Sequence, residues 1–207
     1  MGEVVVLEYA SLDGVVQAPG HAEEDRSGGF EHGGWTQPYF GDHRRCMTEA
    51  LSSCGAFLFG RRTYSIFAGY WPTVTDPADE IATVLNSRRK YVASRQLADP
   101  AWQPATVLAG PLAESVRTVA AKTEGDLVVL GSGALVQQLQ AAGVVDRWEI
   151  LLHPVVVGSG SRMFGPQQDP AHLRLTRCRS TEQGLVLLTY SAARQARAAP
   201  EPAGSRP

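Results

Sequence analysis

The sequence predicts an α/β fold in which a mixed, mostly parallel sheet carries helices on both faces and ends in an antiparallel hairpin. Short apolar runs alternate with amphipathic segments as far as residue 157, a pattern typical of strands joined by crossover helices. Two further apolar runs, LRLTRCRS and GLVLLTY, then follow each other closely, as in a hairpin. Because the chain has 207 residues, 43% of them hydrophobic, we expect one large domain over residues 1–191.

The first third of the chain is expected to hold a strand, a long loop and a helix. Residues 3–9 form the strand, and residues 42–53 form a helix with one apolar face. The basic cluster HRR at 43–45 is expected on the solvated face of that helix. Residues 11–41 are irregular and long for a structureless connection, which favours a functional loop.

The remaining elements follow from apolar periodicity and from start and stop signals. In chain order we expect a strand at 56–59, a helix from Arg61, a helix near 77–86 started by Asp76 or Asp79, and strands at 90–94 and 105–109. These are followed by a helix at 111–122 opened by Pro111, a strand at 126–130 and a helix at 134–141. One bent strand or two at 148–157, with Pro154 at the bend, then lead to the closing hairpin. Residues 192–207 contain mostly Ala, Pro, Arg and Gly, so they are expected to form a disordered tail.

Bulk composition limits the class of protein. A net charge of −2 argues against a nucleic-acid or membrane-surface partner, and no apolar run approaches the roughly 20 residues of a membrane span. The chain shows no basic leader, and its three cysteines form no close pair, which indicates reduced thiols in the cytoplasm. Metallopeptidase, P-loop and serine-hydrolase motifs are not found, and we expect no metal.

Two arginines stand where a helix should disfavour cations. In GAFLFGRRTY, Gly60 ends a strand and Arg61 and Arg62 open a helix, whose N-terminal end already carries a partial positive charge. Either the side chains turn into water or an anion binds between them. Losing one charge-assisted hydrogen bond of this kind costs roughly 1.5–3 kcal/mol, which is tenfold or more in affinity.

A second anion-friendly segment is the glycine turn Gly131-Ser132-Gly133 between a buried strand and a helix. Small residues let the backbone approach a phosphate, and the helix start offers free N–H donors. Val136 occupies the third glycine position of the dinucleotide fingerprint, so an ordinary Rossmann domain is rejected. A tight turn that binds nothing explains the pattern equally well.

A third strand end carries Ser94 and Arg95. Ligands of such sheets bind beyond the carboxyl ends of the strands, so these groups are expected to meet the other two segments there. Pyrophosphate donors together with guanidinium groups for a ribose 2′-phosphate suit a phosphorylated dinucleotide. Taken alone, Ser94 and Arg95 also fit a solvated turn.

Other polar residues have ordinary explanations. Asp13 precedes Gly14 and fits a turn, as does the second GSG at 158–160. His153 is expected to be packed or half-exposed in its strand rather than catalytic. Trp35 and Tyr39 could roof a flat substrate, since aromatic faces stack on planar rings, or Trp35 could anchor the loop in the core.

The segments SLDG, FLFGRRTY, KYVAS, LVVLGSGALVQQL and HPVVVGSGSRMF, in this order, resemble the dihydrofolate-reductase-like family over residues 3–190. The chain is similar in particular to the C-terminal reductase domain of bifunctional riboflavin-biosynthesis enzymes and its stand-alone relatives. The resemblance implies a sheet of about eight strands, NADPH as hydride donor, and often a homodimer.

The resemblance also assigns residues. Cofactor phosphates would be held by Gly60, Arg61, Arg62 and Thr63, with Ser94 and Arg95 at the adenosine 2′-phosphate. The pyrophosphate and nicotinamide side would be lined by Gly131, Ser132, Gly133, Ala134 and Leu135. A loop that begins at Leu12, Asp13 and Gly14 would close over the nicotinamide.

Two departures from the family bear on the substrate. Dihydrofolate reductases have an acidic residue on the first helix, for which Asp42 is the nearest candidate here, with Glu49 further along. Riboflavin-pathway reductases commonly have an acidic residue where this chain has Arg147, which argues against their pyrimidine substrate.

The sequence thus predicts an NADPH-dependent reductase of a small heterocyclic or carbonyl-like substrate, pyrimidine-like or pterin-like. Asp13, Asp42 or a bound water would supply any proton. Two alternatives stay open: an NADP(H)-binding or sensing protein without catalysis, and a dihydrofolate reductase substitute.

Overall fold

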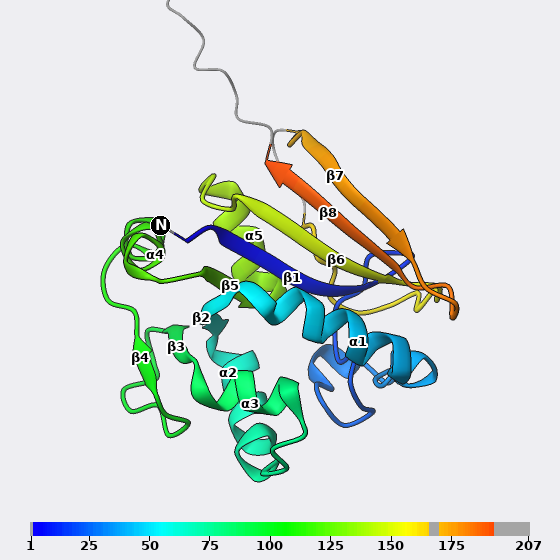
Figure 1. The fold of residues 1–207 in the computed structure, drawn as a ribbon, viewed down its shortest axis with the longest axis horizontal. Helices are drawn as coiled ribbons and strands as arrows, with labels where there is room; N and C mark the ends of the chain where they lie inside the picture. Colours follow the sequence, from blue (N-terminus) through cyan, green and yellow to red (C-terminus); the bar gives the residue numbers. More distant parts are fainter. Residues whose placement is uncertain (1, 166–169, 193–207) are drawn as a thin grey trace, which may run out of the picture.

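The computed structural model describes residues 2–165 and 170–192 and shows one eight-stranded sheet flanked by helices (Figure 1). The strands are β1 (Val4–Ser11), β2 (Cys54–Gly60), β3 (Arg89–Ala93), β4 (Ala105–Val107), β5 (Asp126–Leu130), β6 (Arg147–His153), β7 (Leu173–Ser180) and β8 (Val186–Ala192). The helices are α1 (Phe40–Ala50), α2 (Arg61–Tyr70), α3 (Glu80–Ser87), α4 (Leu112–Lys122) and α5 (Gly133–Ala141), with short 3-10 turns η1 (Ser27–Gly29), η2 (Gln37–Tyr39), η3 (Leu51–Ser53) and η4 (Trp71–Thr73).

The strand order is β4-β3-β2-β5-β1-β6-β8-β7. The first six strands in this order pair in parallel, and β8 and β7 complete the sheet as antiparallel strands. This confirms the predicted fold class: a mixed, mostly parallel sheet with a C-terminal antiparallel hairpin. The carboxyl ends of β3, β2, β5, β1 and β6 therefore lie along one edge of the sheet.

Helices cover both faces of the sheet, as predicted. Apolar side chains of α1, α2 and α3 pack with Phe57, Phe59 and Leu130 on one face. On the other face α4 and α5 pack with Leu58, Val129 and further strand residues. In Figure 1, α1 crosses in front of the sheet and α5 lies behind it. β5 is buried along its whole length because helices cover it on both sides.

Element ends differ from the sequence predictions where capping and proline chemistry decide them. The strand expected to run to residue 157 ends at His153, because Pro154 lacks an N–H for the ladder, so the second half of that prediction is wrong. Helix α3 begins at Glu80 because the Asp79 side chain accepts a hydrogen bond from the Ala82 N–H at 3.0 Å. The helix expected at 42–53 is α1 followed by η3.

The predicted boundary between the domain and its C-terminal tail can be compared with the structure only as far as residue 192. Strand β8 includes Ala192, so the expected tail starts at least one residue later than predicted. The rest of that expectation, residues 193–207, lies outside the described residues.

Within residues 2–165 and 170–192, every helix falls short of the length and apolarity that crossing a bilayer requires.

Candidate active site

The segments singled out in the sequence follow neighbouring strands of the sheet. β2 pairs with β3 so that Gly60 lies opposite Ala93, which places Arg61 beside Ser94. On its other side β2 pairs with β5, whose last residue is followed directly by Gly131. The connection from β2 leaves on one face through α2, and that from β5 leaves on the other face through α5. The boundary between β2 and β5 is therefore a topological switch point, where open α/β sheets bind their ligands.

Two segments meet at this switch point, and we call them the β2–β5 junction (residues 60–63 and 131–134). The Gly60 N–H donates a hydrogen bond to the Ser132 hydroxyl oxygen at 2.9 Å. A methyl group added at Gly131 would lie 3.3 Å from the Cγ2 atom of Thr63. The arginine-led turn and the glycine turn, some 70 residues apart in the chain, are thus in direct contact.

The junction leaves backbone donors at two helix starts without side-chain acceptors. Neither Gly60, before α2, nor Ser132, before α5, caps its own helix with a side chain. Ser132 is in the left-handed region, with φ of 71°, which is uncommon for a residue other than glycine. Because the Ser132 hydroxyl binds Gly60, it does not cap α5, and the N–H groups of Gly133 and Ala134, with the partial positive charge of the helix start, remain for an anion.

The two arginines behave differently. Arg62 donates from Nη1 to the Ser27 hydroxyl at 2.8 Å and to the Asp25 carboxylate at 3.3 Å, so it holds the long loop after β1. Arg61 is exposed, and nothing in the described part of the chain bonds to its guanidinium. The charge left over at the helix start is therefore mainly that of Arg61.

Ser94 and Arg95 follow the last residue of β3, Ala93, which pairs with the Gly60 that precedes Arg61. The Ser94 hydroxyl accepts hydrogen bonds from the N–H groups of Gln96 and Leu97, which shapes the turn, and Arg95 is exposed. Leu135, expected to line the cofactor, is 5% exposed and packs in the core under α5. The first turn of α5 therefore offers Gly133 and Ala134 to a ligand rather than the Leu135 side chain.

The loop after β1 packs against the segment after β6. The Leu12 N–H donates to the Val155 carbonyl, and the Asp13 carboxylate accepts from the N–H groups of Val157 and Gly158 at 3.0 and 2.9 Å. Hydrogen bonds from the Ser11 hydroxyl and from those two amides hold the pKa of Asp13 far below its usual range. A carboxylate so firmly ionised is a poor proton donor, and its contacts fasten the two loops together.

The Asp42 carboxylate is also bound by neighbouring groups of the protein. It is buried in the first turn of α1 and accepts from the Gln183 N–H at 3.0 Å and from Arg45 at 2.7 Å. Hydrogen bonds from Thr181 and Gln183, with the nearby Arg45 charge, lower its pKa. The carboxylate therefore joins α1 to the β7–β8 turn and is not free to pair with a ligand.

The two aromatic residues of the loop after β1 that were expected near the substrate have different surroundings. Trp35 is buried among Val15, Ala18 and Phe30, and its Nε1 donates to the Gln17 carbonyl at 2.9 Å. The structure thus places Trp35 as a loop anchor, which was the alternative to a roof over the substrate. Tyr39 is half-buried, and its hydroxyl reaches the Pro154 carbonyl at 3.4 Å.

A group of rings that the sequence did not bring together lies beyond β5, at the carboxyl ends of β1 and β6. We call it the histidine cluster, and it consists of Tyr9, Tyr39, His43 and His153. The placement of His43 on a solvated helix face was wrong, because the side chain is half-buried and its ring centroid lies 4.3 Å from that of Tyr9, with the two rings tilted by 42°. Its spacing from the buried Cys46 and Met47 is helical and could have revealed this. His153 is fully buried, as expected.

Arg147 lies at the opposite edge of the sheet. It forms ion pairs with Glu3, Asp126 and Glu149 at the amino ends of β1, β5 and β6. The inference drawn from this residue about the substrate therefore loses its basis, because the side chain pairs with carboxylates at the start of the sheet and does not face the candidate site.

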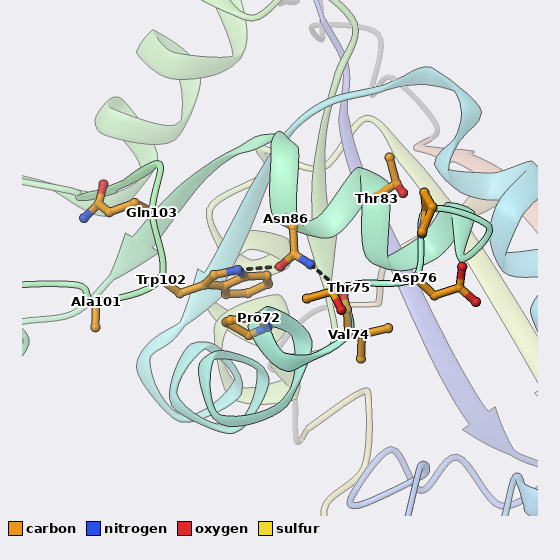
Figure 2. A pocket seen from close by; sticks show the side chains of 10 residues that line it. Pro72, Val74, Thr75, Asp76, Thr83, Asn86, Ala101, Trp102 and Gln103 are labelled. Atoms are coloured by element: carbon orange, nitrogen blue, oxygen red, sulfur yellow. Dashed lines mark hydrogen bonds between the residues drawn. The ribbon is translucent and has the colours of Figure 1, made fainter.

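A groove of about 640 Å³ lies beside the amino ends of β3 and β4, away from the junction (Figure 2). At its base Asn86 accepts a hydrogen bond from the Trp102 Nε1 at 2.9 Å and donates one to the Trp71 carbonyl at 2.9 Å. These polar groups are used to hold α3 and the loop before β4. The chemistry of the groove is therefore structural, and the strand ends are the better candidate site.

The sheet order and the site define a dihydrofolate-reductase-like fold, and comparisons agree. A putative riboflavin biosynthesis protein from Shewanella sp. PV-4 superposes with a TM-score of 0.66 at 16% identity, over 94% of this chain and all of that one. Dihydrofolate reductase from Enterococcus faecalis, solved with NADP(H), superposes with a TM-score of 0.55 at 13% identity, over 93% of this chain and 97% of that one.

Comparison of sequences identifies the family of this chain more narrowly than comparison of folds does. The model of the RibD C-terminal domain family matches residues 3–187, so this chain belongs to that family. The uncharacterized protein YyaP of Bacillus subtilis (strain 168) is 26% identical over 146 residues, which cover 70% of this chain and 77% of the relative.

Proposed function

We propose that this protein is an NADPH-dependent reductase of a small heterocyclic or carbonyl-like compound. The observation that carries the proposal is the β2–β5 junction, where two helices without side-chain caps start in contact at the switch point of the sheet. The E. faecalis neighbour with this fold was solved with NADP(H), which supports the same class of cofactor here.

The donor set fits such a cofactor. The first-turn N–H groups at Gly133 and Ala134 would hold the pyrophosphate, and the exposed guanidinium groups of Arg61 and Arg95 would pair with the 2′-phosphate. A Cβ atom at Gly131 would lie only 3.3 Å from Thr63 Cγ2, so glycine lets the two turns lie close together. Reduced nicotinamide, when bound, supplies the hydride, and the chain supplies binding and orientation.

The loop after β1 would cover the nicotinamide side. Arg62 holds it through Asp25 and Ser27, and Asp13 holds it against residues 157–158. Val16 of this loop lies 3.1 Å from the position of a Cβ atom at Gly133, so the loop already touches the first turn of α5. Since Asp13 and Asp42 are both engaged, the proton for the substrate would come from water.

The engaged carboxylates also favour a second candidate, an NADP(H)-binding or sensing protein without catalysis. They argue against a dihydrofolate reductase substitute, because both acidic groups of the first helix are paired: Asp42 with Gln183 and Arg45, and Glu49 with Arg177 and Arg179. We further propose a cytoplasmic homodimer, as family resemblance implies, and light scattering of the purified chain tests the dimer.

Calorimetric titration with NADPH and NADH tests the cofactor, and NADPH oxidation with a panel of pterins, pyrimidines and quinones tests the activity. We expect tight binding of NADPH, weaker binding of NADH and turnover of at least one compound. Binding without turnover across the panel would favour the sensor. If neither nucleotide releases or absorbs heat, the whole proposal fails.

A further inference from the structure

A buried carboxyl group that the proposed function does not use lies within β1. Glu8 is only 2% exposed, and its Oε1 atom has no hydrogen-bond partner among the described residues. Asp13 and Asp42, by contrast, are each held by backbone amides and neighbouring side chains. A buried polar atom without a partner costs free energy, so a chain that keeps one calls for a functional explanation.

The Glu8 side chain points into the layer between the sheet and α5. Val6 and Ala10, two residues before and two after it, belong to the core cluster that also contains Leu135 of α5. Tyr9, the next residue along β1, packs on the opposite face, against α1. Because alternate residues of a strand share a face, Glu8 lies on the α5 side of β1.

The register of the sheet places Glu8 at the level of the glycine turn. Leu7 pairs with Leu130, and the Leu7 carbonyl accepts a hydrogen bond from the Gly131 N–H at 3.3 Å. Glu8 and Gly131 are the next residues of these two neighbouring chain segments, which run about 4.8 Å apart in a sheet. The N–H groups proposed to hold the pyrophosphate begin two residues further on, in the first turn of α5.

The elements packed around Glu8 present no charged group to it within residues 2–165 and 170–192. Helix α5 carries no charged side chain, and those of α4 are exposed. β5 and β6 turn apolar side chains to this layer, while their carboxylates, Asp126 and Glu149, pair with the same arginine. In the segment over the first turn of α5, Arg162 pairs with Asp13 at 3.7 Å.

The uncharged acid is the form of Glu8 that the fold favours. Burial without a partner raises the pKa of Glu8 well above its ordinary value of 4.5. The other titratable groups near this part of the sheet, Tyr9 and the two histidines of the histidine cluster, lie on the opposite face. Glu8 therefore titrates in a layer where nothing offsets its negative charge.

The charge of Glu8 matters for the anion proposed at the junction, so this step rests on the proposed function. The start of α5 carries a partial positive charge, and a carboxylate on the neighbouring strand would oppose it. From these observations we infer that Glu8 controls cofactor affinity: the uncharged acid leaves the pyrophosphate site positive, and the carboxylate weakens binding. Because such coupling is reciprocal, a bound pyrophosphate makes Glu8 harder to ionise.

Calorimetric titration with NADP⁺ between about pH 7 and about pH 9.5 tests the inference. The 2′-phosphate is already ionised over this range, and Glu8→Gln keeps the size of the side chain while removing its ionisation. We expect the affinity of the wild-type chain to fall by several-fold to about tenfold more than that of Glu8→Gln as pH rises. Titration elsewhere in the chain, that of Lys90 included, affects both profiles alike. Identical profiles would overturn the inference.

Glu114→Gln is the matched control, because Glu114 is exposed on α4, and it should follow the wild-type profile. Calorimetry in two buffers of different ionisation enthalpy counts the protons exchanged on binding. The wild-type chain and Glu114→Gln should take up more protons with NADP⁺ than Glu8→Gln does, since the nucleotide returns Glu8 to its uncharged form. A purely structural role for Glu8 would leave the proton count the same in all three chains.

Urea unfolding against pH provides a readout that needs no nucleotide. The folded wild-type chain holds the Glu8 proton above pH 4.5 and the unfolded chain releases it, so wild-type stability falls as pH rises and Glu8→Gln lacks this loss. The stability gap between them should therefore widen from about pH 5 upward, and a constant gap would refute the inference. Failure of NADP⁺ to bind the wild-type chain would refute the proposed function as well, whereas binding with equal pH profiles would refute only the role of Glu8.

Discussion

The β2–β5 junction and the histidine cluster lie on the same edge of the sheet, yet they are built from different kinds of residue. The junction consists of glycines, helix starts and exposed guanidinium groups, with a hydroxyl that closes it at 2.9 Å. The cluster consists of aromatic rings whose two histidines are uncharged. The contrast teaches that one edge of a sheet can hold two kinds of chemistry: positive charge and backbone donors suit phosphates, whereas buried rings keep their histidines uncharged.

The largest expected effect concerns the cluster and appears as pH dependence. His43 has a folded pKa of about 4 against an ordinary value of 6.5, so the unfolded chain binds more protons between these values. Its stability contribution is present above pH 6.5 and is lost as pH falls toward 4, by roughly 3 kcal/mol at about 1.4 kcal/mol per pKa unit. His43→Phe should therefore flatten this part of the curve of unfolding free energy against pH.

Urea unfolding at half-unit pH steps measures this difference. The His172→Phe control should follow the wild-type curve, because that side chain is exposed. Parallel curves for His43→Phe and wild type between pH 4 and 6.5 would show that His43 titrates like a solvated histidine and would remove the contrast between the two regions.

The next effect concerns the junction. Arg61→Ala should weaken NADPH binding by tenfold or more, corresponding to roughly 1.5–3 kcal/mol, and leave NADH nearly unchanged, because only NADPH carries the 2′-phosphate. Arg62→Ala should give a smaller loss that is the same for both nucleotides, since Arg62 bonds to Asp25 and Ser27. Titration calorimetry of both variants with both nucleotides separates the two roles.

An equal loss of NADPH and NADH in Arg61→Ala would assign that arginine to the fold. A loss confined to NADPH in Arg62→Ala would move the phosphate contact to Arg62 and show that its bond to Asp25 gives way to the cofactor.

A smaller effect is expected at Ser132, where the junction closes. Ser132→Ala and Ser132→Gly both remove the hydrogen bond to the Gly60 N–H, but only glycine adopts a φ of 71° without steric cost. We expect the glycine variant to be the more stable of the two by about 1 kcal/mol. Urea midpoints with equal m-values measure this, and identical midpoints would mean that the left-handed conformation is not strained.

The smallest effect is local to the loop that covers the junction. Asp13→Asn should lower the thermal midpoint slightly at pH 7, because the carboxylate accepts from the Val157 and Gly158 amides and from the Ser11 hydroxyl. The low folded pKa of Asp13 means that its contribution is present above about pH 4 and lost below it. The midpoints of variant and wild type should therefore converge in acid, and a constant gap would contradict this.

Much of the fold could be predicted because the signals are local. Strand and helix periods, Asp79 as a cap and the glycine turn at 131–133 each depend on a few neighbouring residues. The prediction failed at residues 154–157, where the apolar run continues but Pro154 interrupts the ladder. It failed again at His43, whose neighbours in sequence are charged and whose neighbours in space are Tyr9 and His153.

The candidate site, too, could be predicted from the sequence only in part. That GRR and GSG turns suit phosphates could be predicted from residue types, but which arginine is free could not, because Asp25 and Ser27 approach Arg62 only in the folded chain. Asp13 and Asp42 looked available as proton donors until the structure placed backbone amides and hydroxyls around them.

The sequence by itself determined the alternation of strands and helices, the positive charge after β2 and the small residues after β5, because these properties reside in consecutive residues. Only the tertiary structure decided that residues 60–63 touch residues 131–134, that Arg147 lies at the far edge, and that two histidines from α1 and β6 share one buried cluster. The physical reason is that strand order and crossover side bring together groups that are distant in the chain, and their charge state depends on that burial.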